Sequence, residues 1–186
     1  MVIFNELIGL LWLIFVVYWV VSAIGVKKNI EQRGAGWFRW LLIIVVFVLV
    51  GSKNFRSFIV HHSFNFSHPA VQAIGVILCA AGIALAIWAR RHIGRNWGMP
   101  MTKKEGAELT TTGPYKFVRN PIYSGVFLAM IGTAIVVSPW WLLIFIFYAS
   151  YFFYSAKVEE KIMLEKFPDT YPAYRQRTKM FIPFLF

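Results

Sequence analysis

Long runs of apolar residues alternate along this chain with short polar segments. The first run extends from Ile3 to Val26. As a helix rising about 1.5 Å per residue, it is long enough to cross a hydrocarbon core of about 30 Å. Four further runs follow, at Trp37–Gly51, Val71–Ala89, Pro121–Ser138 and Trp140–Ala156. The pattern predicts an all-α, polytopic integral membrane protein with five transmembrane helices.

Charged residues and proline define the ends of these runs. Lys27 and Lys28 follow the first run, and Pro139 separates the fourth from the fifth, so that the last two spans form a helical hairpin. After Lys157 the tail is polar except for two tyrosines and an apolar end. We expect this C-terminal segment to lie on the membrane surface or against the helices, and the 186 residues to form one domain.

The distribution of basic residues predicts the orientation. Residues 27–40 hold four, 90–119 hold seven and 157–179 hold six, so 17 of the 19 lie on one side of the predicted membrane. The positive-inside rule makes that side cytoplasmic. The N-terminus is then outside and the C-terminus inside, in the cytoplasmic membrane of a bacterium or archaeon.

Composition supports a membrane protein and limits the classes of partner that it can be expected to bind. The chain is 59% apolar, with a mean hydropathy of +0.62, more than a soluble domain carries. Its net charge of +11 is typical of nucleic-acid binding, but the basic residues lie between apolar runs rather than on one polar face. We therefore expect membrane lipids with anionic headgroups as partners, and no nucleic acid.

Cysteine and histidine give no strong metal signal. Cys79 is the only cysteine and lies within an apolar run, which is typical of a small buried side chain. His61, His62 and His68 lie in the predicted external loop without a cysteine or acidic residue among them. No metal site is predicted.

The segment from 90 to 119 is the longest polar stretch between predicted spans, and loops of this length in small proteins are usually either functional or disordered. We favour a functional loop. At its end, Asn120 and Pro121 are typical of a helix start, with asparagine as N-cap. A helix N-terminus presents backbone N–H groups and a positive dipole, and Arg119 lies beside it. A carboxylate or phosphate could bind there.

Glu159 and Glu160 follow the fifth predicted span. A lysine-compensated, solvated helix face is one interpretation of this pair. The other is that a carboxylate holds an ammonium or ribose hydroxyl of a ligand whose opposite end meets the helix start at Asn120. Both segments border the hairpin of the last two spans.

Four ordered pieces of the chain resemble the isoprenylcysteine carboxyl methyltransferase family and the related phospholipid N-methyltransferases. They are Thr112–Tyr115, Arg119–Gly125, Glu159–Glu160 and Phe167–Tyr174. The resemblance covers roughly residues 75–183, which would form the catalytic core, whereas residues 1–70 carry no matching motif. It implies a helical membrane enzyme that binds S-adenosylmethionine between its last two spans, the preceding loop and the C-terminal segment.

By position, the resemblance also implies the site residues. Those around the cofactor would be Gly113, Tyr115, Arg119, Asn120, Tyr123, Glu159 and Glu160. Asn96 and Trp97, with Gly94 and Arg95, would line the approach to the methyl group. Asparagine stands at 120 where the family usually has histidine, so an imidazole base is not expected there.

Methyl transfer mainly requires alignment of nucleophile, methyl carbon and sulfur, with water excluded. Arg119 and Arg95 are the candidate catalytic residues, because a guanidinium can hold an acceptor carboxylate through two hydrogen bonds. The expected substrate is a lipophilic molecule or lipid that enters from the bilayer. Methylation at oxygen, sulfur or nitrogen stays open at this point.

Two other functions fit part of the pattern. Membrane sterol-type reductases, which use NADPH, share the Arg-x-Pro-x-Tyr-x-Gly spacing but generally have more spans. A non-catalytic lipid-binding or scaffold protein could keep the same fold without activity.

Overall fold

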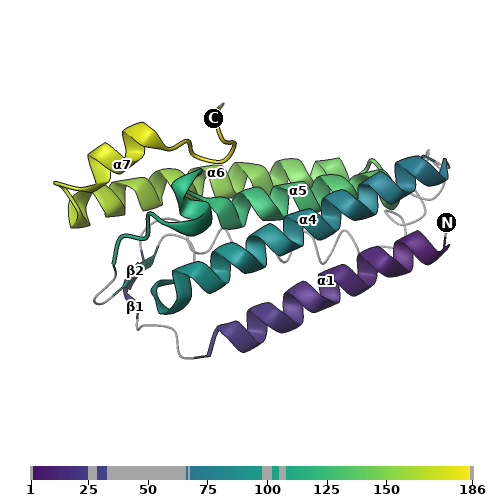
Figure 1. The fold of residues 1–186 in the computed structure, drawn as a ribbon, viewed down its shortest axis with the longest axis horizontal. Coiled ribbons are helices and arrows are strands. Elements are labelled where there is room, and N and C mark those ends of the chain that lie inside the picture. Colours follow the sequence, from purple (N-terminus) through teal and green to yellow (C-terminus); the bar gives the residue numbers. More distant parts are fainter. Residues whose placement is uncertain are drawn as a thin grey trace.

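Four long helices form the body of the protein in the computed structural model, which describes residues 2–24, 29–32, 66, 68–97, 102–104 and 108–184. They are α1 (Val2–Ser22), α4 (Pro69–Ile93), α5 (Pro121–Val136) and α6 (Trp141–Lys166). In Figure 1, α1, α4 and α6 all end on the left, and α5 begins there. The predicted span at Trp37–Gly51 lies outside the described residues.

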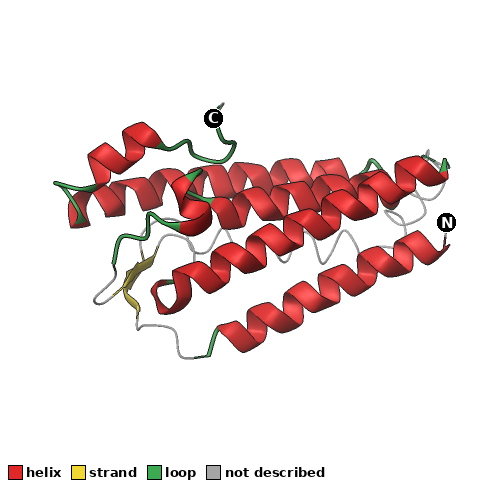
Figure 2. Ribbon diagram, viewed as in Figure 1, coloured by secondary structure: helices red, strands yellow, loops and turns green. Residues whose placement is uncertain are grey.

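Shorter elements gather at that same end (Figure 2). They are β1 (Asn29–Gln32), β2 (Thr102–Lys104), the 3₁₀ turns η1 (Gly94–Asn96) and η2 (Gly113–Lys116), and α7 (Tyr171–Arg177). The two strands pair antiparallel, with Asn29 opposite Lys104. The all-α prediction therefore holds for the helices but missed this small pair, because segments of four and three residues carry no usable periodicity.

Three described helices are long and apolar enough to cross a membrane: Val2–Ser22, Pro69–Asn96 and Trp141–Lys166. The fourth, α5, is apolar but has only 16 residues. On α1, Leu13, Val17 and Val20 are 58%, 54% and 66% exposed, as expected of side chains that face lipid rather than water. The chain is an integral membrane protein.

Helices α4 and α5 approach closely because glycines face each other at two levels. A Cβ atom added to Gly82 would lie 2.4 Å from the Gly125 carbonyl oxygen, and one added to Gly75 would lie 3.0 Å from the Gly132 carbonyl oxygen. In each helix the two glycines are seven residues apart, which places them on one face. Small residues at such interfaces let helix backbones pack directly in a membrane.

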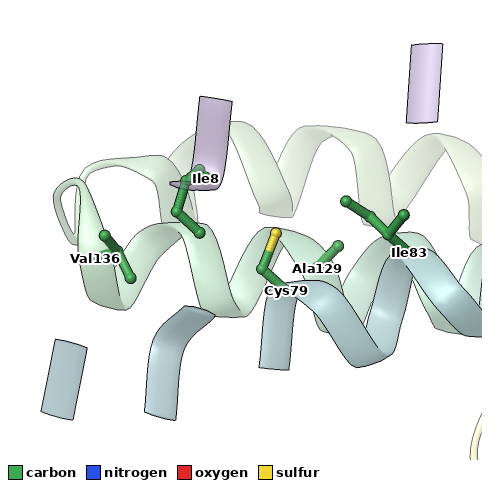
Figure 3. Packing of buried hydrophobic residues seen from close by; sticks show 5 residues of the cluster. All are labelled: Ile8, Cys79, Ile83, Ala129 and Val136. Atoms are coloured by element: carbon green, nitrogen blue, oxygen red, sulfur yellow. The ribbon is translucent and has the colours of Figure 1, made fainter. Parts of the chain in front are cut away.

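Helix α1 packs on this pair through a small apolar core (Figure 3). The core joins Ile8 of α1, Cys79 and Ile83 of α4, and Ala129 and Val136 of α5. One polar contact accompanies it, because the indole N–H of Trp12 donates a 2.9 Å hydrogen bond to the Thr133 hydroxyl. The predicted burial of Cys79 is confirmed, since it is fully buried.

A buried arginine ties the C-terminal end of α1 to α4. Arg90 is only 3% exposed. Its guanidinium donates to the Ser22 carbonyl oxygen and, at 2.8 Å, to the Gly94 carbonyl oxygen. It also lies 4.6 Å from the centre of the Trp97 ring, which meets Trp19 edge-on at 5.6 Å. Cationic side chains inside membrane helices are held by such carbonyl and aromatic partners.

The C-terminal segment lies against the start of α5 rather than away from the helices. The amide N–H groups of Arg119 and Asn120 donate to the carbonyl oxygens of Lys179 and Met180 at 2.8 and 3.1 Å. The Ser124 hydroxyl donates to the Phe181 carbonyl oxygen at 2.6 Å. The C-terminal segment was expected on the membrane surface or against the helices, and the structure shows it against the helices.

Candidate active site

A cavity of about 170 Å³ lies where η1, η2, α5, α6 and α7 meet, and we call it the polar cavity because charged and polar groups form part of its wall. Its wall combines carboxylates, tyrosines and basic groups with apolar side chains. The lining residues are Ile93, Asn96, Trp97, Glu108, Leu109, Thr110, Tyr115, Arg119, Asn120, Ile122, Tyr123, Ala156, Glu159, Glu160, Ile162, Met163, Lys166, Tyr171 and Tyr174. Segments more than 60 residues apart in the sequence thus form one site.

The structure brings together most of the residues predicted for the site. Eight of the eleven line the polar cavity: Asn96, Trp97, Tyr115, Arg119, Asn120, Tyr123, Glu159 and Glu160. Gly94, Arg95 and Gly113 do not, although all three belong to elements at its edge. Arg95 is exposed. The chemical roles assigned to these residues remain predictions.

The extension of α6 brings Glu159 and Glu160 into the site. The sequence predicted that this span ends near Ala156, but the helix continues to Lys166. A polar stretch after a membrane span can stay helical when its backbone hydrogen bonds continue, so the loss of apolar residues did not mark the helix end. Two successive positions on one helix point about 100° apart. Glu159 and Glu160 consequently meet different partners.

Glu160 is paired within the protein. It is 5% exposed, and its Oε1 accepts hydrogen bonds from Arg119 Nε at 2.8 Å and Arg119 Nη2 at 2.7 Å. Its second oxygen, Oε2, lies 3.5 Å from the guanidinium of Arg175. Arg119 Nη1 also donates to the carbonyl oxygens of Arg175, at 3.1 Å, and Thr178. This network fastens the C-terminal segment to α6.

Asn120 occupies the predicted N-cap position of α5, and Pro121 is the first helical residue. The asparagine side chain does not cap the helix, however. Its Nδ2 instead donates a 3.3 Å hydrogen bond to the Met180 carbonyl oxygen. Asn120 therefore helps to hold the C-terminal segment, while Ile122 and Tyr123 at the helix start face the cavity.

Glu159 lies next to Tyr123. The Tyr123 hydroxyl donates a 2.7 Å hydrogen bond to Glu159 Oε1. The tyrosine ring stacks on Phe152 of α6, with ring centres 4.4 Å apart. Stacking fixes the ring, and the hydrogen bond fixes the carboxylate, so the pair is held rigidly between α5 and α6.

Tyr115 closes another side of the polar cavity. Burial raises the pKa of Tyr115, and the nearby negative charge of Glu159 raises this pKa further. Burial also raises the pKa of Tyr174 to about 12. Tyr174 thus keeps its proton at neutral pH and donates a 2.7 Å hydrogen bond to the Tyr115 carbonyl oxygen. This bond joins α7 to η2 across the site.

Gly113 supports Tyr115 from outside the cavity. Its φ of +59° is a conformation that other residues rarely adopt, and an added Cβ would lie 2.6 Å from the His92 ring. His92 hydrogen-bonds Thr112 at 2.8 Å and stacks near Tyr115, with ring centres 6.5 Å apart. Backbone shape and this close approach both require glycine at position 113. The cofactor-binding role that the resemblance implies for Gly113 stays a prediction.

A second, larger cavity of about 860 Å³ is almost wholly apolar. Its wall comes from α1, α5 and α6, with Trp97 at one end. The lining residues are Asn5, Ile8, Gly9, Trp12, Phe15, Trp19, Trp97, Ile122, Tyr123, Val126, Met130, Thr133, Val137, Trp141, Ile144, Tyr148 and Phe152. Trp97, Ile122 and Tyr123 line both cavities.

Sequence reasoning missed the contribution of α1 to this wall. Trp12, Phe15 and Trp19 are spaced three and four residues apart, so one face of the helix is aromatic. That spacing was the available signal. It also missed Glu108, which lines the polar cavity and has no motif around it.

Of the three histidines weighed as metal ligands, His68 caps α4 by accepting from the Ala70 amide at 3.3 Å, and His61 and His62 lie outside the described residues.

One polar atom in this site lacks a partner. Asn96 Oδ1 is buried and accepts no hydrogen bond from any residue that the structure describes. Asn96 lines the polar cavity and directly precedes Trp97, which lines both. Buried carbonyl oxygens in proteins are nearly always satisfied, and this one is an exception.

The part of the chain that is similar to known proteins is the part that carries the candidate site. The model of the phospholipid methyltransferase family matches residues 71–170. This range contains α5, α6 and nearly all of α4, and thus the larger part of both cavity walls. It does not include α1, or the end of the C-terminal segment.

Individual relatives are methyltransferases of related kinds. The protein-S-isoprenylcysteine O-methyltransferase of Saccharomyces cerevisiae is 32% identical over 127 residues, or 66% of this chain and 53% of the relative. Its namesake in Schizosaccharomyces pombe is 24% identical over 90% of this chain and 67% of the relative. Methanethiol S-methyltransferase 1 of Bradyrhizobium diazoefficiens is 39% identical over 37% of this chain and 24% of the relative. The chain spans about half the length of the Saccharomyces protein.

Proposed function

Because the chain belongs to the phospholipid methyltransferase family, we propose that it is a membrane enzyme that transfers a methyl group from S-adenosylmethionine to a lipophilic acceptor. The observation that carries this proposal is the shared wall of Trp97, Ile122 and Tyr123 between a polar and an apolar cavity. A reaction between a water-soluble donor and a lipid-soluble acceptor needs two sites of opposite character that meet.

The polar cavity has groups suited to the cofactor. Glu108 and Glu159 line it and can accept from ribose hydroxyls or from an ammonium group. The start of α5 faces it through Ile122 and Tyr123, and a helix N-terminus favours a carboxylate. Tyrosine and tryptophan rings in the wall can face a sulfonium. The residues present therefore fit S-adenosylmethionine, which supplies an electrophilic methyl group on a positively charged sulfur.

The apolar cavity fits the hydrocarbon part of the acceptor. Its wall is almost wholly apolar and includes the aromatic face of α1. An acceptor that comes from the bilayer leaves an environment already as apolar as this wall, so the cavity would select the acceptor by the shape and length of its hydrocarbon. The reacting group would then lie at Trp97, Ile122 and Tyr123, next to the polar cavity.

The residues of the site mainly bind and position in this mechanism. Tyr123 and Glu159 form the polar edge of the shared wall through their 2.7 Å hydrogen bond. Arg119 and Glu160 hold the C-terminal segment across the cavity through their ion pair, which limits access of water. Alignment of this kind accounts for a large part of the barrier reduction in group transfer.

The proposed orientation follows from the charges at the site end. Arg91, Arg95 and Lys157 belong to elements that begin or end near the polar cavity, and the basic residues of the sequence concentrate in the same segments. The positive-inside rule then places the cavity at the cytoplasmic face, where S-adenosylmethionine is made. The acceptor would enter from the bilayer.

Methyl transfer in a defined bilayer tests the proposal. Purified protein in nanodiscs is incubated with S-adenosylmethionine carrying a labelled methyl group and with lipophilic acceptors of several nucleophile types. The proposal predicts a labelled, solvent-extractable product that forms only with the protein present. Binding of S-adenosylhomocysteine without any product would favour a non-catalytic lipid-binding protein, and binding of NADPH instead would favour a reductase.

A further inference from the structure

From the contacts at the C-terminal ends of α1 and α4, we infer that Arg90 is a positioning residue, which fixes the ring of Trp97 in the wall shared by the two cavities. The inference rests on the proposed function, because it gives a task in that reaction to a residue outside the site. Arg90 lines neither cavity. Its effect on the reaction therefore has to pass through a residue that does.

The burial of Arg90 is the first observation. Arg90 is 3% exposed and belongs to a helix that is long and apolar enough to cross a membrane. Its Nε is buried and has no hydrogen-bond partner among the residues that the structure describes. An ionisable side chain inside a membrane helix is costly and usually marks a function. The contacts that Arg90 does make indicate what this function is.

Trp97 is the member of the shared wall that lies beyond the end of a helix. Ile122 and Tyr123 belong to α5, and the Tyr123 ring is stacked on Phe152, with ring centres 4.4 Å apart. Trp97 instead follows the turn η1, with a non-helical backbone at φ −59° and ψ 138°. The orientation of its ring consequently depends on the side chains around it.

Two side chains contact the Trp97 ring. The guanidinium carbon of Arg90 lies over the ring, 4.6 Å from its centre. The ring of Trp19, on α1, meets it edge-on, with ring centres 5.6 Å apart and planes at 88°. The attraction between a cation and an aromatic face is strongest where water is excluded, as it is around the buried Arg90.

Backbone carbonyl groups fix the guanidinium itself. Arg90 donates a 2.8 Å hydrogen bond to the Gly94 carbonyl oxygen, and the Trp97 amide N–H donates to the same oxygen at 3.2 Å. Arg90 also donates to the Ser22 carbonyl oxygen, three residues after Trp19 and so within the same turn of α1. Figure 1 shows α1 and α4 ending at the same end of the molecule. Arg90 thus joins the last turn of α1 to Trp97.

This arrangement matters because group transfer is sensitive to small displacements. A misplacement of about 1 Å can lower the rate roughly a hundredfold. Without the Arg90 guanidinium, the Trp97 ring can turn in the shared wall, where the acceptor and the methyl group would meet. Loss of Arg90 then lowers turnover although no group that lines either cavity has been removed.

Fluorine NMR tests the positioning directly. The eight tryptophans of the full-length protein are replaced by fluorotryptophan, and Trp97→Phe identifies the Trp97 signal by its loss. We expect Arg90→Gln to shift or split this signal. Arg91→Gln, at an exposed arginine on the same helix, should leave it unchanged. An unchanged Trp97 signal in Arg90→Gln would overturn the inference.

A double-mutant cycle separates positioning from a purely structural tie between α1 and α4. Labelled methyl transfer is measured with decanethiol, decylamine or decanoate, whichever wild type methylates fastest. We expect Arg90→Gln to lower kcat/KM about tenfold, the value of a desolvated cation–π contact. In a Trp97→Leu background the same change should lower it little further, because the residue through which Arg90 acts is gone. Effects that multiply in full would overturn the positioning role.

Arg90→Lys keeps the test decisive if Arg90→Gln does not fold. Lysine retains the positive charge, but its ammonium group lacks the planar fork that reaches two carbonyl oxygens while lying over a ring. In that case we expect a shifted Trp97 signal and a lower kcat/KM in Arg90→Lys. A folded Arg90→Lys protein with both quantities unchanged would overturn the inference.

Failure of the proposed function gives a different result. If wild type methylates none of the three acceptors and does not bind S-adenosylhomocysteine, the proposed function fails, while the NMR signal still decides whether Arg90 holds Trp97. If wild type is active and the Trp97 signal or the cycle contradicts the expectation, only the role of Arg90 fails.

Discussion

The Tyr123 hydroxyl donates a 2.7 Å hydrogen bond to Glu159 at the wall shared by the polar and the apolar cavity. The two residues are 36 positions apart and come from different helices of the α5–α6 hairpin. Their contact makes the hairpin the place where a soluble donor and a lipophilic acceptor would meet.

Replacing Tyr123 by phenylalanine keeps the ring that stacks on Phe152 but removes the hydroxyl. A hydrogen bond to a charged group contributes about 1.5–3 kcal/mol, so we expect kcat to fall roughly tenfold to a hundredfold while the protein stays folded. Turnover and thermal unfolding of purified protein measure the two effects. Tyr148→Phe, in the apolar cavity alone, is the matched control. Equal turnover by Tyr123→Phe and wild type would remove the hydroxyl from the mechanism.

Replacing Arg119 by alanine leaves Glu160 buried with only Arg175, at 3.5 Å, as a charged partner in the described part of the chain. Breaking a buried ion pair costs about 3–5 kcal/mol. We expect a lower unfolding temperature and faster proteolysis of the C-terminal segment. Arg177→Ala, an exposed arginine bonded to the Ala173 carbonyl oxygen, should change neither. An unchanged cleavage rate in Arg119→Ala would show that the ion pair does not hold the segment.

Gly82→Ala tests the close packing of α4 on α5. The new Cβ would lie 2.4 Å from the backbone nitrogen of Ala129, so the helices must separate, and overpacking of this kind costs about 1–3 kcal/mol. Gly9→Ala is the same substitution on α1, where no residue that the structure describes lies within 4 Å of the added atom. Thermal unfolding in detergent should distinguish them. A Gly82→Ala protein as stable as Gly9→Ala would contradict the direct backbone contact.

Trp12→Ala should alter acceptor choice without altering cofactor binding. The Trp12 indole lines the apolar cavity and hydrogen-bonds Thr133, whereas the polar cavity does not include it. Removing the indole enlarges the space for hydrocarbon, so we expect kcat/KM to shift toward longer acceptors, by about tenfold for one added methylene that the wild-type indole excludes. Trp88→Ala, at a half-exposed position on α4, is the control. The same chain-length profile in Trp12→Ala and wild type would argue that α1 does not contact the acceptor.

The sequence predicted the elements of this fold better than their contacts. Apolar run lengths located α1, α4 and α5 within a few residues, because a span must be long enough for the bilayer. The end of α6 was predicted ten residues early, at Ala156 instead of Lys166, since polar residues after a span look alike in a helix and in a tail. The pair β1–β2 was too short for any pattern.

For the site, residue identity was predictable but pairing was not. Tyr123, Glu159 and Glu160 were all expected near the cofactor, yet nothing in the sequence indicated that Arg119 would be paired with Glu160, 41 positions away. Asn120 was expected to cap α5, but its side chain reaches Met180 instead. These side-chain partners depend on where the C-terminal segment lies in the fold, and the order of residues along the chain does not give that position.

The measurement that tests the central claim most directly is calorimetric binding of S-adenosylhomocysteine to the protein in nanodiscs. Glu159→Gln, in the wall of the polar cavity, is compared with Glu165→Gln, an exposed carboxylate on the same helix that does not line it. The account predicts saturable binding to wild type and Glu165→Gln, and affinity about tenfold lower in Glu159→Gln. No binding to folded wild-type protein, or equal affinity in all three proteins, would contradict the polar cavity as the cofactor site.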